Sequence, residues 1–324
     1  MVLEIFLRFY IDYAIDYYAG KHEPGIRTYP YGTIKINSDG QSDEEFPSVG
    51  TKPRIGYAGD SVIYGVGAGQ GYRVQDIIRK NVQNADHLTF GALAIGIENP
   101  EKLWDLAKTY SLDTIIYFLN LNDILPDEVK KKHQGNFLRR SILFAKKNLD
   151  QLRGKSYLYN FFRTKIKTLL ILYGYNQSGF QAYELFPEKY SNIFAQTGQR
   201  VNATFKKLRE NNVNFCVVLL PYEMQISNEA ARHYGELGIQ WEEGFLNRSA
   251  QNRMLEIIDP EVPYLDAYYA FVDVNKAKQS LNENRIGEFF VFDKGDKLDW
   301  NHPNRLGHQR IAQRILDQKF CGLN

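Results

Sequence analysis

Runs of apolar residues alternate along most of the chain with segments of helical periodicity. The apolar runs have the length of buried strands, and the periodic segments have the length of helices. We predict strands at 54–58, 87–90, 114–119, 214–220 and 263–266. We predict helices at 70–81, 100–110, 190–211, 249–258 and 303–320. Strands that alternate with helices indicate an α/β fold with a mostly parallel sheet.

The first fifty residues depart from this alternation. Residues 2–18 have the pattern of one helix with a single narrow polar stripe, formed by Glu4, Arg8, Asp12 and Asp16. Such a helix must bury most of its circumference, either on the protein's own core or on a membrane surface. Residues 22–52 are rich in Gly, Pro, Ser, Asp and Glu, which is typical of a loop or edge element on the surface.

A second departure is a basic segment after the third predicted strand. Residues 129–170 contain twelve Lys and Arg and one acid, Asp150, a net charge of +11 in a chain whose total is +2. Apolar residues from 158 to 173 follow helical spacing, so we predict a basic helical insertion or cap at 126–190. Its charge suits an anionic glycan or membrane surface, and a solvated, self-packing cap is the alternative. No nucleic-acid motif accompanies the charge, so we expect no nucleic-acid partner.

Composition places few further limits on the protein. The 324 residues are 44% hydrophobic and 24% charged, which suits one large domain with an insertion. No uninterrupted apolar stretch of about twenty residues and no cleavable signal peptide is visible, which favours a cytoplasmic or membrane-peripheral protein. The two cysteines are too few for a disulfide framework or a zinc site. Cys216 lies in an apolar run and is interpreted as a buried small hydrophobic residue in a reducing compartment.

Two short motifs at opposite ends of the chain carry the residues for chemistry. Gly59-Asp60-Ser61 follows the first strand, and Asp299-Trp300-Asn301-His302 precedes the last helix. A serine hydroxyl is a weak nucleophile until a base takes its proton, and a carboxylate orients that base. Ligands of such sheets bind at the carboxyl ends of the strands. A strand–turn–helix junction would expose Ser61 at that edge.

These motifs resemble the four sequence blocks of the SGNH/GDSL hydrolases and occur in the family's order. The first block resembles Gly59-Asp60-Ser61, and the last resembles Asp299-Trp300-Asn301-His302. The second resembles residues 89–96, and the third resembles Asn120-Leu121-Asn122-Asp123. The resemblance covers residues 51–125 and 191–324. It implies a three-layer α/β/α sandwich with a mostly parallel, flavodoxin-like sheet.

The resemblance also implies roles for individual residues. Ser61 would be the nucleophile, His302 the base, and Asp299 the residue that orients the base. The oxyanion hole would consist of the Ser61 backbone N–H, a backbone N–H of the second block and the Asn122 side chain. The donor from the second block would be the backbone N–H of either Gly91 or Ala94, and Gly91 is slightly preferred.

The blocks differ from the family at three positions. Val62 stands where Leu is usual, Asn120 where Gly is usual, and Thr89 where Asn is common. Singly, each motif has a plain structural explanation: a glycine-rich turn for Ser61, a strand-end turn for Asn122, a helix cap for the histidine. Their joint order and spacing indicate a site.

Other polar residues near these motifs receive no catalytic role. His308 is predicted on the helix surface, and Tyr222 and Glu223 follow the fourth strand, where they could line a pocket. Asp293, Asp296 and Asp299 form an incomplete oxygen set, so we expect no metal and no cofactor.

The sequence therefore predicts a serine esterase. It would remove an O-acyl group, with acetyl preferred, from a carbohydrate or similar ester through a serine acyl-enzyme. The alternative is an O-acyltransferase, as some members of the family are in bacterial polysaccharide modification; a non-catalytic binding module is the third hypothesis. We divide the chain into a helix and surface arm at 1–50 and a catalytic domain at 51–324.

Overall fold

A five-stranded parallel sheet forms the centre of the computed structural model. The structure describes residues 2–10, 23–29, 31–91, 100–124, 156, 158–159, 161–162, 166, 185–236, 248–292 and 299–323. The strands are β3 (Arg54–Gly59), β4 (Asp86–Gly91), β5 (Thr114–Asn120), β6 (Asn214–Leu220) and β7 (Tyr264–Asp266). All five predicted strands are present. Their spatial order is β4-β3-β5-β6-β7, the flavodoxin-like order in which the first strand of the sheet along the sequence lies second.

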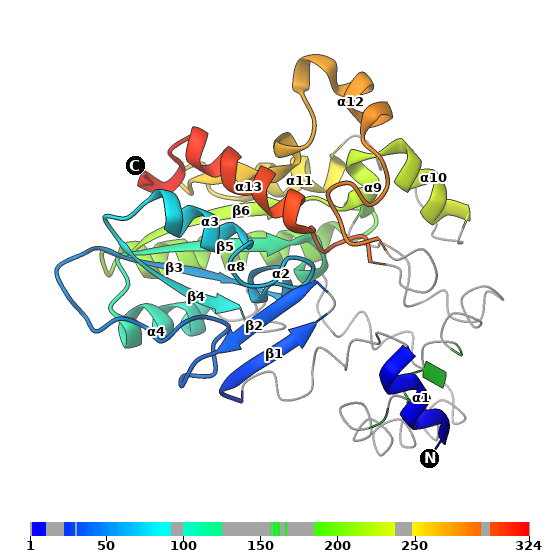
Figure 1. The fold of residues 1–324 in the computed structure, drawn as a ribbon. Helices are drawn as coiled ribbons and strands as arrows, with labels where there is room; N and C mark the ends of the chain where they lie inside the picture. The colour runs from blue at the N-terminus through cyan, green and yellow to red at the C-terminus, as the bar shows by residue number, and fades with distance from the viewer. Residues whose placement is uncertain are drawn as a thin grey trace, which may run out of the picture.

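Helices cover both faces of this sheet (Figure 1). One face carries α3 (Val74–Asn81) and α13 (Arg305–Asp317), and the other carries α4 (Pro100–Tyr110), α8 (Ser191–Arg209) and α11 (Ser249–Ile257). Side chains alternate along β5, so that Tyr117 packs in one core and Phe118 in the other. The predicted three-layer α/β/α sandwich is confirmed.

The long helices lie close to their predicted ranges. α4 has the predicted bounds, and α8 and α11 lie within theirs. α3 begins at Val74, four residues later than predicted, because Gly65, Gly67, Gly69 and Gly71 all have left-handed φ angles and hold the chain in turns. Further short elements are α2 (Ser61–Tyr64), α9 (Glu223–Ile226), α10 (Asn228–Glu236), α12 (Ala277–Glu283), η1 (Leu121–Asp123), η6 (Ala267–Ala270), η7 (Val274–Lys276) and η8 (Phe320–Gly322).

The N-terminal arm contains an antiparallel hairpin, β1 (Gly25–Tyr29) and β2 (Gly32–Ile36). The hydroxyl groups of Tyr29 and Tyr64 lie 2.9 Å apart, which joins the hairpin to the end of α2. Further along the arm, the buried Asp43 accepts a hydrogen bond from Thr89 N at 2.9 Å and pairs with Arg79 at 2.6 Å. The arm is therefore attached to the sheet and to α3 by buried polar contacts.

The predicted N-terminal helix is described as α1 (Val2–Tyr10). Leu7 on this helix is buried, whereas Phe6 is half exposed. Glu4 accepts hydrogen bonds from Ser156 Oγ at 3.0 Å and from Leu158 N at 2.9 Å. The rest of that predicted helix and nearly all of the predicted basic insertion lie outside the described residues. Within the described part of the chain, no helix is long and apolar enough to cross a membrane.

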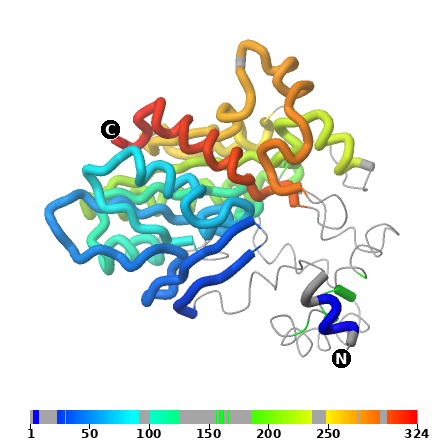
Figure 2. The backbone as a smooth tube through the Cα atoms, in the orientation of Figure 1, coloured from blue at the N-terminus to red at the C-terminus, as the bar shows by residue number. Residues whose placement is uncertain are grey.

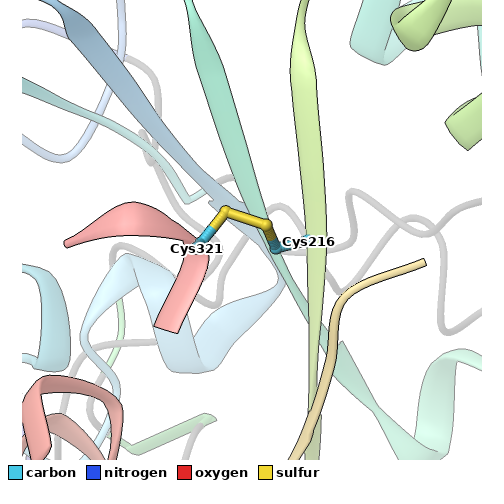
Figure 3. Close-up of a disulfide and its surroundings, with 2 residues drawn as sticks. All are labelled: Cys216 and Cys321. Atoms are coloured by element: carbon cyan, nitrogen blue, oxygen red, sulfur yellow. A yellow bond between two sulfur atoms is a disulfide. The ribbon is translucent and has the colours of Figure 1, made fainter. Parts of the chain in front are cut away.

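A disulfide joins β6 to the C-terminal end of the chain (Figure 3). It links Cys216 to Cys321 in η8, with the two Cα atoms 6.1 Å apart, a normal separation for such a bond. Cys216 is buried as predicted, but the prediction of an unpaired hydrophobic residue is wrong. Its partner is 105 residues away and is brought to β6 by the packing of α13. The disulfide argues against the predicted reducing compartment, because disulfides persist in oxidising surroundings.

Replacing Cys321 with serine should lower the free energy of unfolding. The crosslink closes a loop of 105 residues, and native disulfides typically contribute about 2–4 kcal/mol. Urea unfolding without reductant measures the loss. Dithiothreitol should destabilise the wild type by a similar amount and leave Cys321→Ser unchanged. A wild type indifferent to dithiothreitol would contradict the pairing.

Candidate active site

Ser61 lies at the carboxyl edge of the sheet because β3 turns there directly into α2. Asp60 caps that helix, and its Oδ1 accepts a hydrogen bond from Val62 N at 3.0 Å. Gly59 has no room for a side chain, since an added Cβ would lie 2.8 Å from Ile63 Cγ1. The resulting strand–turn–helix junction leaves Ser61 partly exposed at the edge where β3 and β5 end.

The segment before α13 reaches the same edge of the sheet (Figure 2), and it carries His302, whose Nε2 lies 2.7 Å from Ser61 Oγ. Val291 N donates to His302 O, and Asn304 N donates to Phe289 O, both at 2.9 Å. The Asn304 side chain caps α13 and also donates to the carbonyl oxygens of the segment at Gly287, Glu288 and Phe290, at distances of 3.0–3.1 Å. Asn304 was not among the predicted site residues, although an asparagine just before a helical pattern is a known cap signal.

The structure brings Ser61, His302 and Asp299 into one chain of hydrogen bonds. Ser61 Oγ lies 2.7 Å from His302 Nε2, across 241 residues of sequence. His302 Nδ1 lies 2.6 Å from Asp299 Oδ1. With the proton on Nδ1, the imidazole donates to the carboxylate and leaves Nε2 to accept the serine proton. The side chains of His302 and Asp299 are only 17% and 16% exposed, which strengthens their attraction.

The charge of Asp299 outweighs the effect of burial on His302. Burial alone would lower the pKa of the imidazole, but the Asp299 carboxylate, its hydrogen bond and the nearby Asp60 raise that pKa above the usual 6.5. A stabilised imidazolium is what a base needs after it has taken the serine proton.

Asp60 is a second carboxylate beside the nucleophile. Its Oδ2 lies 3.3 Å from Ser61 Oγ and accepts a hydrogen bond from Asn120 Nδ2, also at 3.3 Å. Burial raises the pKa of Asp60, and hydrogen bonds from Val62 N, Ser61 and the Asn122 side chain oppose the rise. Asn122 thus reaches the carboxyl group next to the nucleophile, at the end of β5.

Gly91 ends β4 opposite Gly59 of β3. A Cβ on Gly91 would lie 2.3 Å from Tyr64 N, so the absence of a side chain lets α2 approach the strand closely. Gly91 therefore lies beside the helix that begins with Ser61. Its role as an oxyanion donor stays a prediction, and the alternative, Ala94, lies outside the described residues.

The predicted position of His308 is wrong. It is fully buried rather than on the helix surface, because the buried face of α13 includes Gly307, His308 and Ile311. Its Nδ1 accepts a hydrogen bond from Val74 N at 3.2 Å, and burial lowers the pKa of its imidazole to about 3. A neutral histidine here joins α13 to α3.

No group of three or more His, Cys, Asp and Glu side chains in the described part of the chain is arranged to hold a metal ion. Asp293 and Asp296, the partners of Asp299 in the sequence pattern, lie outside it.

Neither a protein-family model nor a curated protein sequence matches the chain. Solved structures of similar fold include a lipolytic protein of the G-D-S-L family from Veillonella parvula (13% identity, 82% of this chain and 97% of that chain covered, TM-score 0.42). A catalytic mutant of an acetylxylan esterase from Geobacillus stearothermophilus is 10% identical over 84% of this chain and 96% of its own, with TM-score 0.40. Another acetyl xylan esterase is 11% identical over 82% and 98%, with TM-score 0.40. Sequence identities this low do not transfer a function from one protein to another, so the function of this chain is inferred from the geometry of its candidate active site.

Replacing Asp299 with asparagine should both slow ester hydrolysis and move its pH dependence. A base must be neutral to take a proton, so for His302 in its predicted role the raised pKa should put the loss of activity at a higher pH than for an ordinary histidine. Asp299→Asn removes the charge that raises this pKa, and the acid limb of kcat/KM should shift to lower pH. The same change in a known triad lowers kcat about 10⁴-fold.

The matched control is Asp317→Asn at the exposed end of α13, which should leave kcat and the acid limb unchanged. Wild-type activity and an unmoved limb in Asp299→Asn would show that Asp299 does not act on His302.

Proposed function

We propose that the protein is a serine esterase that works through an acyl-enzyme. Ser61 Oγ attacks the ester carbonyl while His302 Nε2 takes its proton, and His302 then gives that proton to the leaving alcohol. Water attacks the acyl-enzyme with His302 again as base, which releases the acid and restores Ser61. The observation that carries this proposal is the unbroken Ser61–His302–Asp299 hydrogen-bond chain at the carboxyl edge of the sheet.

The negative oxygen of the tetrahedral intermediate requires donors on the side of Ser61 away from the imidazole. The backbone N–H of Ser61, a backbone N–H after β4 and the Asn122 amide would supply them. Asn122 supports this role by its position, since its side chain already reaches Asp60 next to the nucleophile. Donors fixed before the reaction cost no reorganisation when the charge develops.

The finer part of the proposal concerns the substrate, for which acetyl is the preferred acyl group and a carbohydrate the preferred alcohol. The resemblance of the sequence blocks to SGNH/GDSL hydrolases supports an acylated glycan, and the basic sequence between β5 and α8 favours an anionic one. Acetylated oligosaccharides and short-chain aryl esters are therefore the substrates to compare first.

Ser61→Ala should abolish ester hydrolysis. A serine hydrolase without its nucleophile loses about 10⁶-fold in kcat, so release of p-nitrophenol from p-nitrophenyl acetate should fall to background. Ser48→Ala, in an exposed loop, is the matched control and should keep wild-type activity. Full activity in Ser61→Ala would refute a catalytic role for this site.

Asn122→Ala should lower kcat about 10²–10³-fold with little change in KM, because the lost donor acts on charge that develops only in the transition state. Steady-state kinetics with p-nitrophenyl acetate measures both constants. Asn211→Ala, which removes an exposed asparagine at the end of α8, is the control. A rise in KM alone would place Asn122 in substrate binding instead.

The O-acyltransferase alternative uses the same acyl-enzyme with a sugar hydroxyl in place of water. Adding mono- and oligosaccharides to the p-nitrophenyl acetate reaction separates the two functions. An esterase should yield acetate in proportion to p-nitrophenol at every sugar concentration. Acetyl-sugar that grows at the expense of acetate would favour the transferase.

A further inference from the structure

Glu223 is a buried acid that the proposed triad does not use. It begins α9, three residues after β6 ends, and therefore lies at the same edge of the sheet as Ser61. Only 1% of its surface is exposed. Among the described residues no cation pairs with it, and a buried carboxyl group without a cation must be stabilised by hydrogen bonds.

Three hydrogen bonds connect Glu223 to three separate parts of the chain. Its Oε2 accepts from the Tyr234 hydroxyl on α10 at 2.8 Å. Its Oε1 accepts from Gly287 N at 2.6 Å, and its own backbone N–H donates to Trp300 O at 2.8 Å. Trp300 directly follows Asp299, so one of these bonds ends on the loop that carries the triad acid and base.

Tyr234 extends this connection to Asp299. Its hydroxyl oxygen lies 3.5 Å from the Asp299 carbonyl oxygen, and its ring meets the Trp300 ring edge-on with the centroids 5.7 Å apart. The hydroxyl therefore has two acceptors within reach, the Glu223 carboxylate and the Asp299 backbone.

Gly287 extends the connection to the other end of the loop. Its carbonyl oxygen accepts a hydrogen bond of 3.1 Å from Nδ2 of Asn304, a residue that lies two positions after His302. The loop 299–304 is thus linked to Glu223 at both ends, through Trp300 and through Gly287.

We propose that Glu223 is a positioning residue of the triad: its carboxyl group sets the hydrogen bonds that hold the loop carrying Asp299 and His302 against β6 and α10. This rests on the proposed function, because a positioning role presupposes that the loop carries a catalytic base. Glu223 acts through Tyr234 and the backbone and touches neither Ser61 nor substrate in the arrangement described.

The two protonation states of Glu223 give two arrangements of this network. The ionised carboxylate accepts from both Tyr234 and Gly287. After protonation at Oε2, the acid donates to the Tyr234 oxygen, and the Tyr234 hydroxyl proton turns to the Asp299 carbonyl. The ionised form also adds negative charge near Asp299, which favours the imidazolium that His302 becomes in the transition state.

Glu223 changes between these states near neutral pH. Burial raises the pKa of Glu223 to about 7, hydrogen bonds from Gly287 and Tyr234 oppose the rise, and the carboxylates of Asp299 and Glu229 add to it. Within the described chain, these are the titratable groups that face it: Asp299 on the triad loop, and Glu229 and Tyr234 on α10.

Glu223→Gln separates positioning from simple structural support. The glutamine oxygen still accepts from Gly287 N and its amide donates to Tyr234, so the variant copies the protonated arrangement at every pH. Its kcat for p-nitrophenyl acetate should equal that of the wild type near pH 5.5 and fall about three- to ten-fold below it near pH 9, the effect of roughly one hydrogen bond. KM should not change, and Glu256→Gln, which alters an exposed side chain of α11, should match the wild type throughout.

Tyr234→Phe removes the hydrogen-bonded part of this change and leaves the charge of Glu223, so the loss of kcat that Glu223→Gln causes near pH 9 should be smaller in that background. A loss in Glu223→Gln that is equal at every pH would overturn the proposal in favour of mere structural support. Equal activity of Glu223→Gln and wild type at every pH would overturn it too.

Thermal unfolding tests the titration of Glu223 without any assay of activity. Between the pKa of a glutamate in the unfolded chain, about 4.3, and the folded value of about 7, the folded state holds a proton that the unfolded state has lost. The wild type should therefore lose stability relative to Glu223→Gln as pH rises through this window. A difference in Tm that does not vary with pH would overturn the titration. Absence of Ser61-dependent esterase activity in the wild type would instead refute the proposed function.

Discussion

The hydrogen bond between Ser61 Oγ and His302 Nε2 joins the first strand–helix turn of the sheet to the loop before the last helix. It can form only if β3 lies inside the sheet and α13 packs on the face that α2 and α3 cover. The strand order β4-β3-β5-β6-β7 meets the first condition. The packing of α13 on α3, through Ile311 and the buried His308, meets the second.

Three carboxyl groups lie at this edge of the sheet, and their environments differ. Asp299 is hydrogen-bonded to the imidazole of His302. Asp60 is buried beside Ser61 and is stabilised by a helix N-terminus and by side-chain donors. Glu223 has no cation among the described residues and relies on Tyr234 and Gly287, and burial raises its pKa to about 7. One edge of the sheet thus holds acids suited to different tasks.

Sequence periodicity was sufficient to predict the sheet because each strand is a short apolar run bounded by turn residues. β6 illustrates this, since an apolar run from Phe215 to Leu220 ends at Pro221. The motifs around Ser61, Asn122 and His302 could be predicted because each follows a strand or precedes a helix at the edge where parallel strands end. The contact between Asp299 and His302 could also be predicted, because the two residues lie only three positions apart in the sequence.

Contacts between distant segments were beyond the reach of these patterns. No local signal distinguishes a buried histidine on α13 from an exposed one, because the face a helix buries depends on what packs against it. Cys216 and Cys321 gave no sign of their pairing, and Glu223 gave no sign of Tyr234 or Gly287. Each of these contacts depends on how separate elements pack against one another. The sequence by itself determined the order of elements and the chemical groups available. Tertiary structure decided which of these groups meet and how burial shifts their pKa values, because both depend on distances and desolvation that only the packed chain creates.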